Sequence, residues 1–215
     1  MIQLRRHGPL ADKEDVERLR CKFEKSRWAL LPDLLDSQLL SLALSYIEQG
    51  RWREKEIEGF YSESVLEIGA AGNLLLFVCN TPAFLRVIGE ITQFDSLTWF
   101  QGRVYRMKAG HTDDWHDDTS DGRPLAMSIN LSPRRYQGGV FQMRESKSQR
   151  ILMEIANTGL GDALLFQVSS DLEHQVTEVQ TGEPRTAFAG WFHSTKQSMR
   201  ERLNGQKVIQ TAGNT

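Results

Sequence analysis

Three side chains in the second half of the chain have the chemistry of a metal site. The segment Trp115-His116-Asp117-Asp118 supplies His116 and Asp118, and His174 follows well downstream. Two imidazoles and one carboxylate form the facial triad that binds non-haem Fe(II) and leaves coordination positions open for other ligands. We therefore take His116, Asp118 and His174 as candidate metal ligands and catalytic residues.

A cation suited to an acidic cosubstrate stands near the end of the sequence. The guanidinium of Arg185 is planar and can bind a carboxylate through two hydrogen bonds. In a strand, a period of two places Arg185, Ala187, Ala189 and Trp191 on one face. Because this face carries a cation, two small side chains and a large ring, we predict a gap over the two alanines that admits a small flat acid. Close packing of the alanines under another element is the alternative.

Polar residues of two further segments are predicted to line the same cavity. Within residues 125–131, Ser128 and Asn130 share one face of a strand, and Met127, Ile129 and Leu131 share the other. Buried polar groups need hydrogen-bond partners, which a bound polar acid would provide. Tyr105 can present its phenol to this cavity from the strand before the metal motif, although a packing tyrosine is the alternative.

The first part of the chain, which must support these residues, is predicted to be largely helical. Helices are predicted over residues 12–24, over residues 36–48 behind an Asp36 cap, and from Thr81-Pro82 onward, with Phe84, Ile88 and Ile91 facing inward. Trp28–Leu31 is predicted to be a short strand, and residues 74–79 form an apolar run only as long as a strand. Residues 51–69 are charged and irregular, which favours a surface segment, with a mobile loop over the site mouth as the functional alternative.

From Leu97 onward the pattern changes to short strands separated by turn residues. The expected strands are Leu97–Met107 and residues 125–131, 140–143, 163–168, 175–180 and 185–192. Such a series without intervening helices predicts a mainly β sandwich or jelly roll, with the helices packed on one sheet. Alternation along one strand end would let His116 and Asp118 reach the same metal, and His174 is expected in the loop before the strand at 175–180.

Length and composition indicate one ordinary globular domain. Its 215 residues are 40% hydrophobic and 25% charged, with a net charge of -2 and a pI near 6.2. We expect residues 1–96 to provide helical support and outer strands, residues 97–193 the metal-binding core, and residues 194–215 a C-terminal tail. The charge favours neither nucleic acid nor an anionic membrane as a partner, and the sequence does not indicate an oligomeric state.

The cysteines and the lengths of the apolar runs indicate the cellular compartment in which the protein is expected. Cys21 and Cys79 form no metal-type pair, and the first nineteen residues do not resemble a secretion signal. No apolar run has the length of a membrane span. We therefore expect reduced cysteines and a cytoplasmic protein.

Taken together, these motifs resemble the Fe(II)- and 2-oxoglutarate-dependent oxygenases, in particular the prolyl 4-hydroxylase-like branch. The resemblance covers about residues 97–193 and, more loosely, the helical front. It rests on a lengthened Tyr-x-x-Gly lead-in at 105–110, the His116-x-Asp118 iron motif, residues 128–133 with the Gly-Gly element at 136–140, residues 161–166 with His174-Gln175-Val176, and Arg185 with Trp191.

This resemblance implies a double-stranded β-helix, a jelly roll of the cupin-like type. It implies that His116, Asp118 and His174 bind Fe(II) and that Arg185 binds 2-oxoglutarate. Lesser cosubstrate contacts are implied for Tyr105, Asn130, Ser128 and Trp191, although related enzymes often have a larger hydroxyl-bearing aromatic residue where Asn130 stands.

The implied activity is that of a dioxygenase that uses O2 and 2-oxoglutarate, with ascorbate as a candidate reductant. It would hydroxylate an unactivated C–H bond of a small metabolite or of an amino-acid-derived or peptidyl substrate, and release succinate and CO2. Related halogenases replace the carboxylate ligand with a small residue, so the presence of Asp118 favours hydroxylation. Desaturation, cyclisation and epoxidation depend on how the substrate is placed and stay open.

Three other functions fit part of this pattern. A cupin-like metalloenzyme that does not use 2-oxoglutarate would not need Arg185 beside the Ala187/Ala189 gap. A non-catalytic sensor on the same scaffold would not need a complete triad. A zinc hydrolase would need a general base, and the nearby strand offers no evident one.

Overall fold

A computed structural model describes residues 1–57, 61–119, 122–156 and 158–194 of the chain. Its helices are α1 Lys13–Ser26, α2 Ser37–Glu48, α3 Ala70–Cys79 and α4 Pro82–Thr92. Its strands are β1 Ile2–Arg5, β2 Gly8–Ala11, β3 Trp28–Leu31, β4 Trp52–Ile57, β5 Tyr61–Leu66, β6 Leu97–Met107, β7 Asp113–His116, β8 Leu125–Asn130, β9 Tyr136–Gly138, β10 Phe141–Glu145, β11 Ile151–Ile155, β12 Ala163–Gln167, β13 Leu172–Val176, β14 Val179–Gly182 and β15 Arg185–Ser194.

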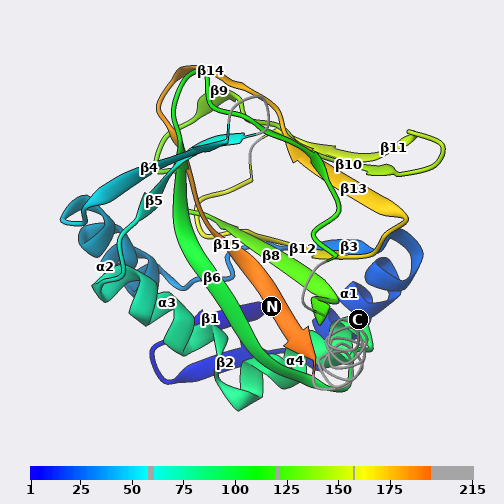
Figure 1. Cartoon of the computed structure of the whole chain (residues 1–215). Helices are drawn as coiled ribbons and strands as arrows, with labels where there is room; N and C mark the ends of the chain where they lie inside the picture. The colour runs from blue at the N-terminus through cyan, green and yellow to red at the C-terminus, as the bar shows by residue number, and fades with distance from the viewer. Residues whose placement is uncertain (58–60, 120–121, 157, 195–215) are drawn as a thin grey trace, which may run out of the picture.

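Most of the strands join one strongly curved antiparallel sheet. Its order is β11-β10-β13-β7-β5-β6-β15-β8-β12-β3, and β4 pairs with β5. Figure 1 shows that β10, β11 and β13 form one layer and that β8, β12 and β3 lie in the other. Side chains of both layers meet in one apolar cluster that includes Phe141, Phe166 and Val176. This arrangement confirms the predicted jelly-roll class.

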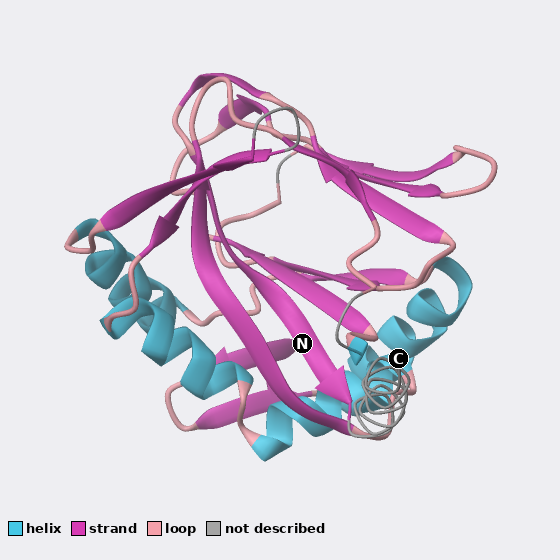
Figure 2. Cartoon of the chain, in the orientation of Figure 1, coloured by secondary structure: helices cyan, strands magenta, loops and turns pink. Residues whose placement is uncertain are grey.

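The helices cover the outer face of one layer only. Figure 2 shows α3 and α4 beside β6, α2 against α3 and α1 beside β3, on the side of the molecule away from β10 and β11. Alternation decides which strand residues they cover: Leu125, Met127 and Ile129 of β8 join the same cluster as the helices, whereas Ala126 belongs to the cluster between the layers. Helical packing on one sheet is therefore confirmed.

Local capping signals place the helix starts where the sequence predicts them. The Asp36 side chain accepts a hydrogen bond from the Leu39 amide at 2.7 Å, and Asp12 accepts one from Glu14 at 2.9 Å. Thr81 caps α4 ahead of Pro82. The inward face of α4 is also as predicted, because Phe84, Ile88 and Ile91 are fully buried.

Several predicted elements are wrong in type or boundary. Residues 51–69 are not an irregular loop, since they contain the β4–β5 hairpin. Helix α3, which contains the apolar run at residues 74–79, was not among the predicted elements. The strand expected at 175–180 is divided between β13 and β14, and β1, β2 and β11 were not predicted. Trp52–Ile57 shows no apolar alternation because it is mostly charged. β1 does alternate, but its four residues are too few for a clear period.

The apolar helices α3 and α4 belong to the core. No single helix in the described part of the chain is long and apolar enough to cross a membrane, and this pair passes on length and composition only together, across a bend of 60°. Leu75 of α3 and Ile88 of α4 are buried in the cluster beneath the sheet.

Candidate metal centre and adjoining cavity

The two histidines of the candidate triad face each other across a pair of strands. His116 ends β7 and pairs directly with His174 in β13. Their ring centroids lie 4.2 Å apart. His174 is therefore held in the middle of a strand rather than in the loop predicted for it, and its backbone is fixed by pairing with both β7 and β10.

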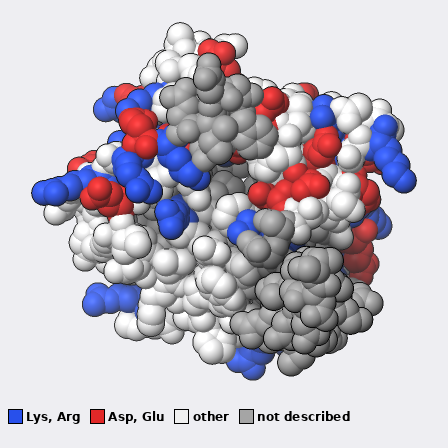
Figure 3. Space-filling model, in the orientation of Figure 1, with Lys and Arg blue, Asp and Glu red and all other residues white. Residues whose placement is uncertain are grey.

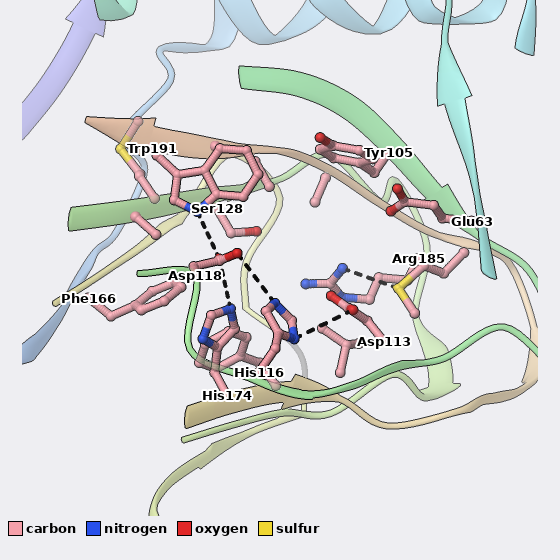
Figure 4. Close-up of a pocket in the computed structure, with 18 of the residues that line it drawn as sticks. Glu63, Tyr105, Asp113, His116, Asp118, Ser128, Phe166, His174, Arg185 and Trp191 are labelled. Carbon is pink, nitrogen blue, oxygen red and sulfur yellow. Dashed lines mark hydrogen bonds and ion pairs between the residues drawn. The ribbon is translucent and has the colours of Figure 1, made fainter. Parts of the chain in front are cut away.

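Asp118 reaches the histidines by a different route from the predicted alternation. It lies beyond the end of β7 and has a left-handed backbone, with a φ of 58°, a conformation that aspartate tolerates better than most residues. Its Oδ2 is 3.3 Å from His174 Nε2, and its Oδ1 is 3.7 Å from His116 Nε2. One ligand atom from each of the three residues lies within 4.8 Å of the others (Figure 4).

Hydrogen bonds outside the triad orient two of its members for a metal ion. His116 Nδ1 lies 2.6 Å from the carbonyl oxygen of Asp114. Because a carbonyl only accepts, Nδ1 carries the hydrogen and the Nε2 lone pair faces the other ligands. Trp191 Nε1 donates to Asp118 Oδ2 at 2.8 Å. A neutral imidazole and an oriented carboxylate, beside a second imidazole, fit the donor set that Fe(II) takes in a facial triad.

The surroundings keep Asp118 charged and His174 in place. Burial alone would raise the pKa of Asp118, but the nearby His174 and His116 and the hydrogen bond from Trp191 outweigh it and hold that pKa below its usual value. The His174 ring packs against Phe166 and Phe141, with centroids 4.9 and 5.7 Å away. These rings shield one side of the triad from water.

A cavity of about 260 Å³ adjoins the triad and contains most of the predicted cosubstrate residues. Its lining includes Tyr105, Ser128, Arg185 and Trp191, together with Ala187 and Ala189. The alternation of β15 is thus as predicted: its cation, two alanines and indole face this cavity, whereas Phe188 and Phe192 face the helices.

Arg185 lies in the part of the cavity away from Trp191 (Figure 4). Its Nη1 is 3.7 Å from Met107 Sδ, and it forms no ion pair within 4 Å with any described residue. Gly139 makes room for its side chain: it has a φ of 57°, and a Cβ there would lie 3.1 Å from Arg185 Cδ. The guanidinium is therefore accessible to a carboxylate in the cavity.

Asn130 is the one predicted cosubstrate residue that the structure does not bring into this cavity. Its side-chain amide donates to the carbonyl oxygens of Thr158 and Gly159 at 2.8 and 3.1 Å, and its Oδ1 accepts from the Ser132 amide at 2.9 Å. It lines a separate cavity of about 30 Å³. These bonds lie at the end of β8, where the side chain satisfies loop backbone rather than a ligand.

Three charged residues of the cavity were not found from the sequence. Lys55 and Glu63 are cross-strand partners in the β4–β5 hairpin, and Asp113 begins β7. Burial and the charge of Asp113 raise the pKa of Glu63 to about 7. Burial also raises the pKa of Asp113 and, with the charge of Glu63, that of Tyr105. The sequence offers one signal for Asp113, its position three residues before His116. It offers none for Lys55 and Glu63, because the sequence of the hairpin shows no strand pattern.

Comparison with known proteins matches the core of the chain to a family. The model of the 2OG-Fe(II) oxygenase superfamily matches residues 100–193. No curated protein matches the chain. Among solved structures, a prolyl-4-hydroxylase from Pseudomonas putida has a TM-score of 0.66 at 15% identity, covering 83% of this chain and 98% of that one.

Two further structures share the fold. A prolyl hydroxylase from Trichoplax adhaerens, in complex with a peptide fragment of hypoxia inducible factor, has a TM-score of 0.67 at 14% identity and covers 88% of this chain and 96% of its own. The epimerase SnoN, in complex with Fe3+, alpha ketoglutarate and nogalamycin RO, has a TM-score of 0.64 at 12% identity, with 85% of each chain covered. At these identities the likeness shows a shared fold.

Proposed function

We propose that this protein, whose residues 100–193 match the model of the 2OG-Fe(II) oxygenase superfamily, hydroxylates an unactivated C–H bond. The substrate is a small metabolite or an amino-acid-derived or peptidyl group. The observation that carries the proposal is the shared cavity: His116, Asp118 and His174 converge in one part of it, and Arg185 lies accessible in another.

Each residue of the site has a distinct task in this reaction. When bound, Fe(II) and 2-oxoglutarate supply the oxidation of the substrate by O2, with release of succinate and CO2. His116, Asp118 and His174 hold the metal and leave coordination positions open. Arg185 binds the distal carboxylate of 2-oxoglutarate through its planar fork. Tyr105 and Ser128 are further candidates for contact with the cosubstrate.

Residues around the ligands control orientation and water. Trp191 fixes the Asp118 carboxylate through its indole N–H. Phe141 and Phe166 form an apolar wall at His174. Because Asp118 occupies its ligand position, there is no vacancy of the kind that a halide needs, which supports hydroxylation over halogenation.

A screen for substrate-stimulated succinate release, with mass analysis of each product, tests this function. We expect a product that gains one oxygen atom, formed only with Fe(II), 2-oxoglutarate and O2. The His116→Ala variant is the matched negative control. A product without added oxygen would refute hydroxylation, and turnover that does not require 2-oxoglutarate would refute the oxygenase reaction itself.

A further inference from the structure

Glu63 faces the cavity from the β4–β5 hairpin, outside the metal and cosubstrate residues. Lys55 and Glu63 are directly opposite each other in the hairpin, and both line the cavity. Figure 4 shows Glu63 near Tyr105 and Arg185, apart from the triad. The charged side chains of the face in Figure 3 gather in its upper part, where the hairpin lies.

The fold compensates the charge of Glu63 only in part. Its side chain is 18% exposed, and the nearest cation, Lys55 Nζ, lies 4.0 Å from Oε1, at the limit of an ion pair. Among the described residues, no hydrogen bond reaches this carboxyl. Burial and the negative charge of Asp113 raise its pKa to about 7, against smaller opposing effects of Lys55, Arg185 and His116. A cation brought into the cavity would therefore stabilise the carboxylate.

The other charges of the cavity lie at the triad, are assigned to the metal or the cosubstrate, or are open to solvent. Asp118 is placed for the metal and Arg185 for the acid of the cosubstrate. Asp113 Oδ1 lies 3.7 Å from His116 Nδ1. Lys55 is half exposed. Glu63 is thus the cavity carboxylate that stays accessible to the substrate once the metal and cosubstrate are bound.

We propose that Glu63 determines substrate specificity, and that the substrate carries a positively charged nitrogen, an ammonium or guanidinium group, that binds the Glu63 carboxylate. This inference rests on the proposed function and narrows its substrate class to basic compounds. A substrate with a carboxylate at the same position would be repelled by Glu63 and Asp113 together.

Matched probes and matched variants test the inference. The probes are lysine, Nε-acetyl-lysine and 2-aminoadipate, each blocked at its α-amino and α-carboxyl groups, so that they differ only in the end group of the side chain, which is positive, neutral or negative. The variants are Glu63→Gln, which removes the charge, and Glu63→Lys, which reverses it. Glu54→Gln is the control: Glu54 lies on the same hairpin, but its carboxylate accepts from Ser64 and pairs with Lys108 and does not line the cavity.

Binding is measured by ligand-observed NMR, and succinate release is measured in the same samples. In the parent protein the amine should bind about tenfold or more tightly than its acetylated partner, as expected for a hydrogen bond between charged groups. This preference should vanish in Glu63→Gln, shift toward the carboxylate in Glu63→Lys and persist in Glu54→Gln.

Two results would overturn the inference. One is equal binding of the amine and its acetylated partner by the parent protein. The other is an amine preference that survives in Glu63→Gln. If that variant keeps the preference and differs from the parent only by binding 2-oxoglutarate more tightly through Arg185, Glu63 acts on the cosubstrate rather than on the substrate, and the inference fails as well. Loss of the oxygenase function would show separately, as an absence of Fe(II)-dependent succinate formation with every probe while the binding preference is still read by NMR.

Discussion

The hydrogen bond from Trp191 to Asp118 connects the candidate metal centre to the strand that carries Arg185. It joins Nε1 and Oδ2 at 2.8 Å, and the Arg123 guanidinium lies over the face of the Trp191 ring, 4.2 Å from its centre. The same strand therefore supports Asp118, the candidate carboxylate ligand, near one end and presents Arg185, the proposed cosubstrate cation, at the other. A shift in the pairing register of β15 would therefore displace the Trp191 indole and the Arg185 guanidinium together.

Removal of either histidine ligand should abolish Fe(II) binding. His116→Ala and His174→Ala each delete one of three donor atoms in a preformed site, so we expect affinity to fall by more than ~100-fold, beyond the loss typical of an outer-sphere residue. Anaerobic Fe(II) titration measures this, with circular dichroism to verify folding. His7→Ala, in the β1–β2 turn, is the control. Parent-like affinity in both ligand variants would refute the assignment.

Acid should weaken Fe(II) binding. The imidazole nitrogens bind metal only when unprotonated, so the metal-bound protein holds fewer protons and its affinity falls as the pH drops. Titrations from about pH 7.5 to about pH 5.5 should show a progressive loss of affinity. A profile that stays level over this range would be inconsistent with ligation by His116 and His174.

Two substitutions of Arg185 should separate the effect of its charge on 2-oxoglutarate binding from the effect of its planar geometry. Arg185→Leu removes the partner of the distal carboxylate and should cost on the order of 2–5 kcal/mol. Arg185→Lys keeps the charge but loses the fork, so its loss should be smaller. Equilibrium binding at saturating Fe(II) compares them, with Arg134→Leu, an exposed partner of Glu183, as the control. Unchanged binding in Arg185→Leu would place the carboxylate elsewhere.

At the scale of the elements, Asn130 stabilises the junction between β8 and the 158–159 loop. Its three hydrogen bonds all go to backbone groups, and the residue is 8% exposed. Asn130→Ala should leave these partners unsatisfied and lower the free energy of unfolding by roughly 1–3 kcal/mol. Urea denaturation measures the loss. The affinity for 2-oxoglutarate should stay near that of the parent; a large drop with normal stability would restore Asn130 to the cosubstrate site.

Elements with local signals are those that the sequence predicts well. The Asp36 cap, Pro82 at the first turn of α4 and the alternation of Arg185–Ser194 act within a few residues, and each predicts its element correctly. The β4–β5 hairpin depends on distant partners instead: Val65 pairs with Tyr105. Its charged strand shows no apolar period, so its place beside the cavity could not be read locally.

The candidate site shows the same division. Ligand types and the face of β15 followed from residue identity and a period of two. The positive φ of Asp118 did not, because aspartate adopts the left-handed conformation only as one of several, and a cluster of turn-forming residues does not show which of them has it. Asn130 was misplaced because a polar residue on a cavity-facing period can equally satisfy a neighbouring loop, and only the three-dimensional positions of residues 158 and 159 decide between these uses.

At the scale of the whole molecule, Glu63 links the cavity to the pH dependence of stability. Its pKa in the folded protein is raised from 4.5 to about 7, by burial first, then by Asp113 and against Lys55 and Arg185. The folded state then binds more protons than the unfolded state between these values, so this residue lowers stability as the pH rises. The full effect corresponds to roughly 3 kcal/mol above neutrality.

Glu63→Gln should therefore stabilise the protein selectively at higher pH. The gain in unfolding free energy over the parent should be small near pH ~4.5 and reach its maximum above pH ~7.5. Urea denaturation across this range measures it. Glu54→Gln serves as the contrast: the pKa of Glu54 is lowered by Lys108 and Ser64, so its removal should not stabilise at high pH. A pH-independent effect of Glu63→Gln would show that Glu63 is not a buried titrating group.

The left-handed backbone at Asp118 bears on how this chain could evolve. Most residues are strained at a φ of 58°, but glycine adopts it freely. A change from aspartate to glycine would delete the carboxylate ligand without distorting the turn, leaving His116 and His174 in their paired strands. The conformation that turns Asp118 toward His116 and His174 thus also makes it the easiest of the three candidate ligands to lose, and opens a short mutational route from a three-ligand to a two-ligand site on an unchanged scaffold.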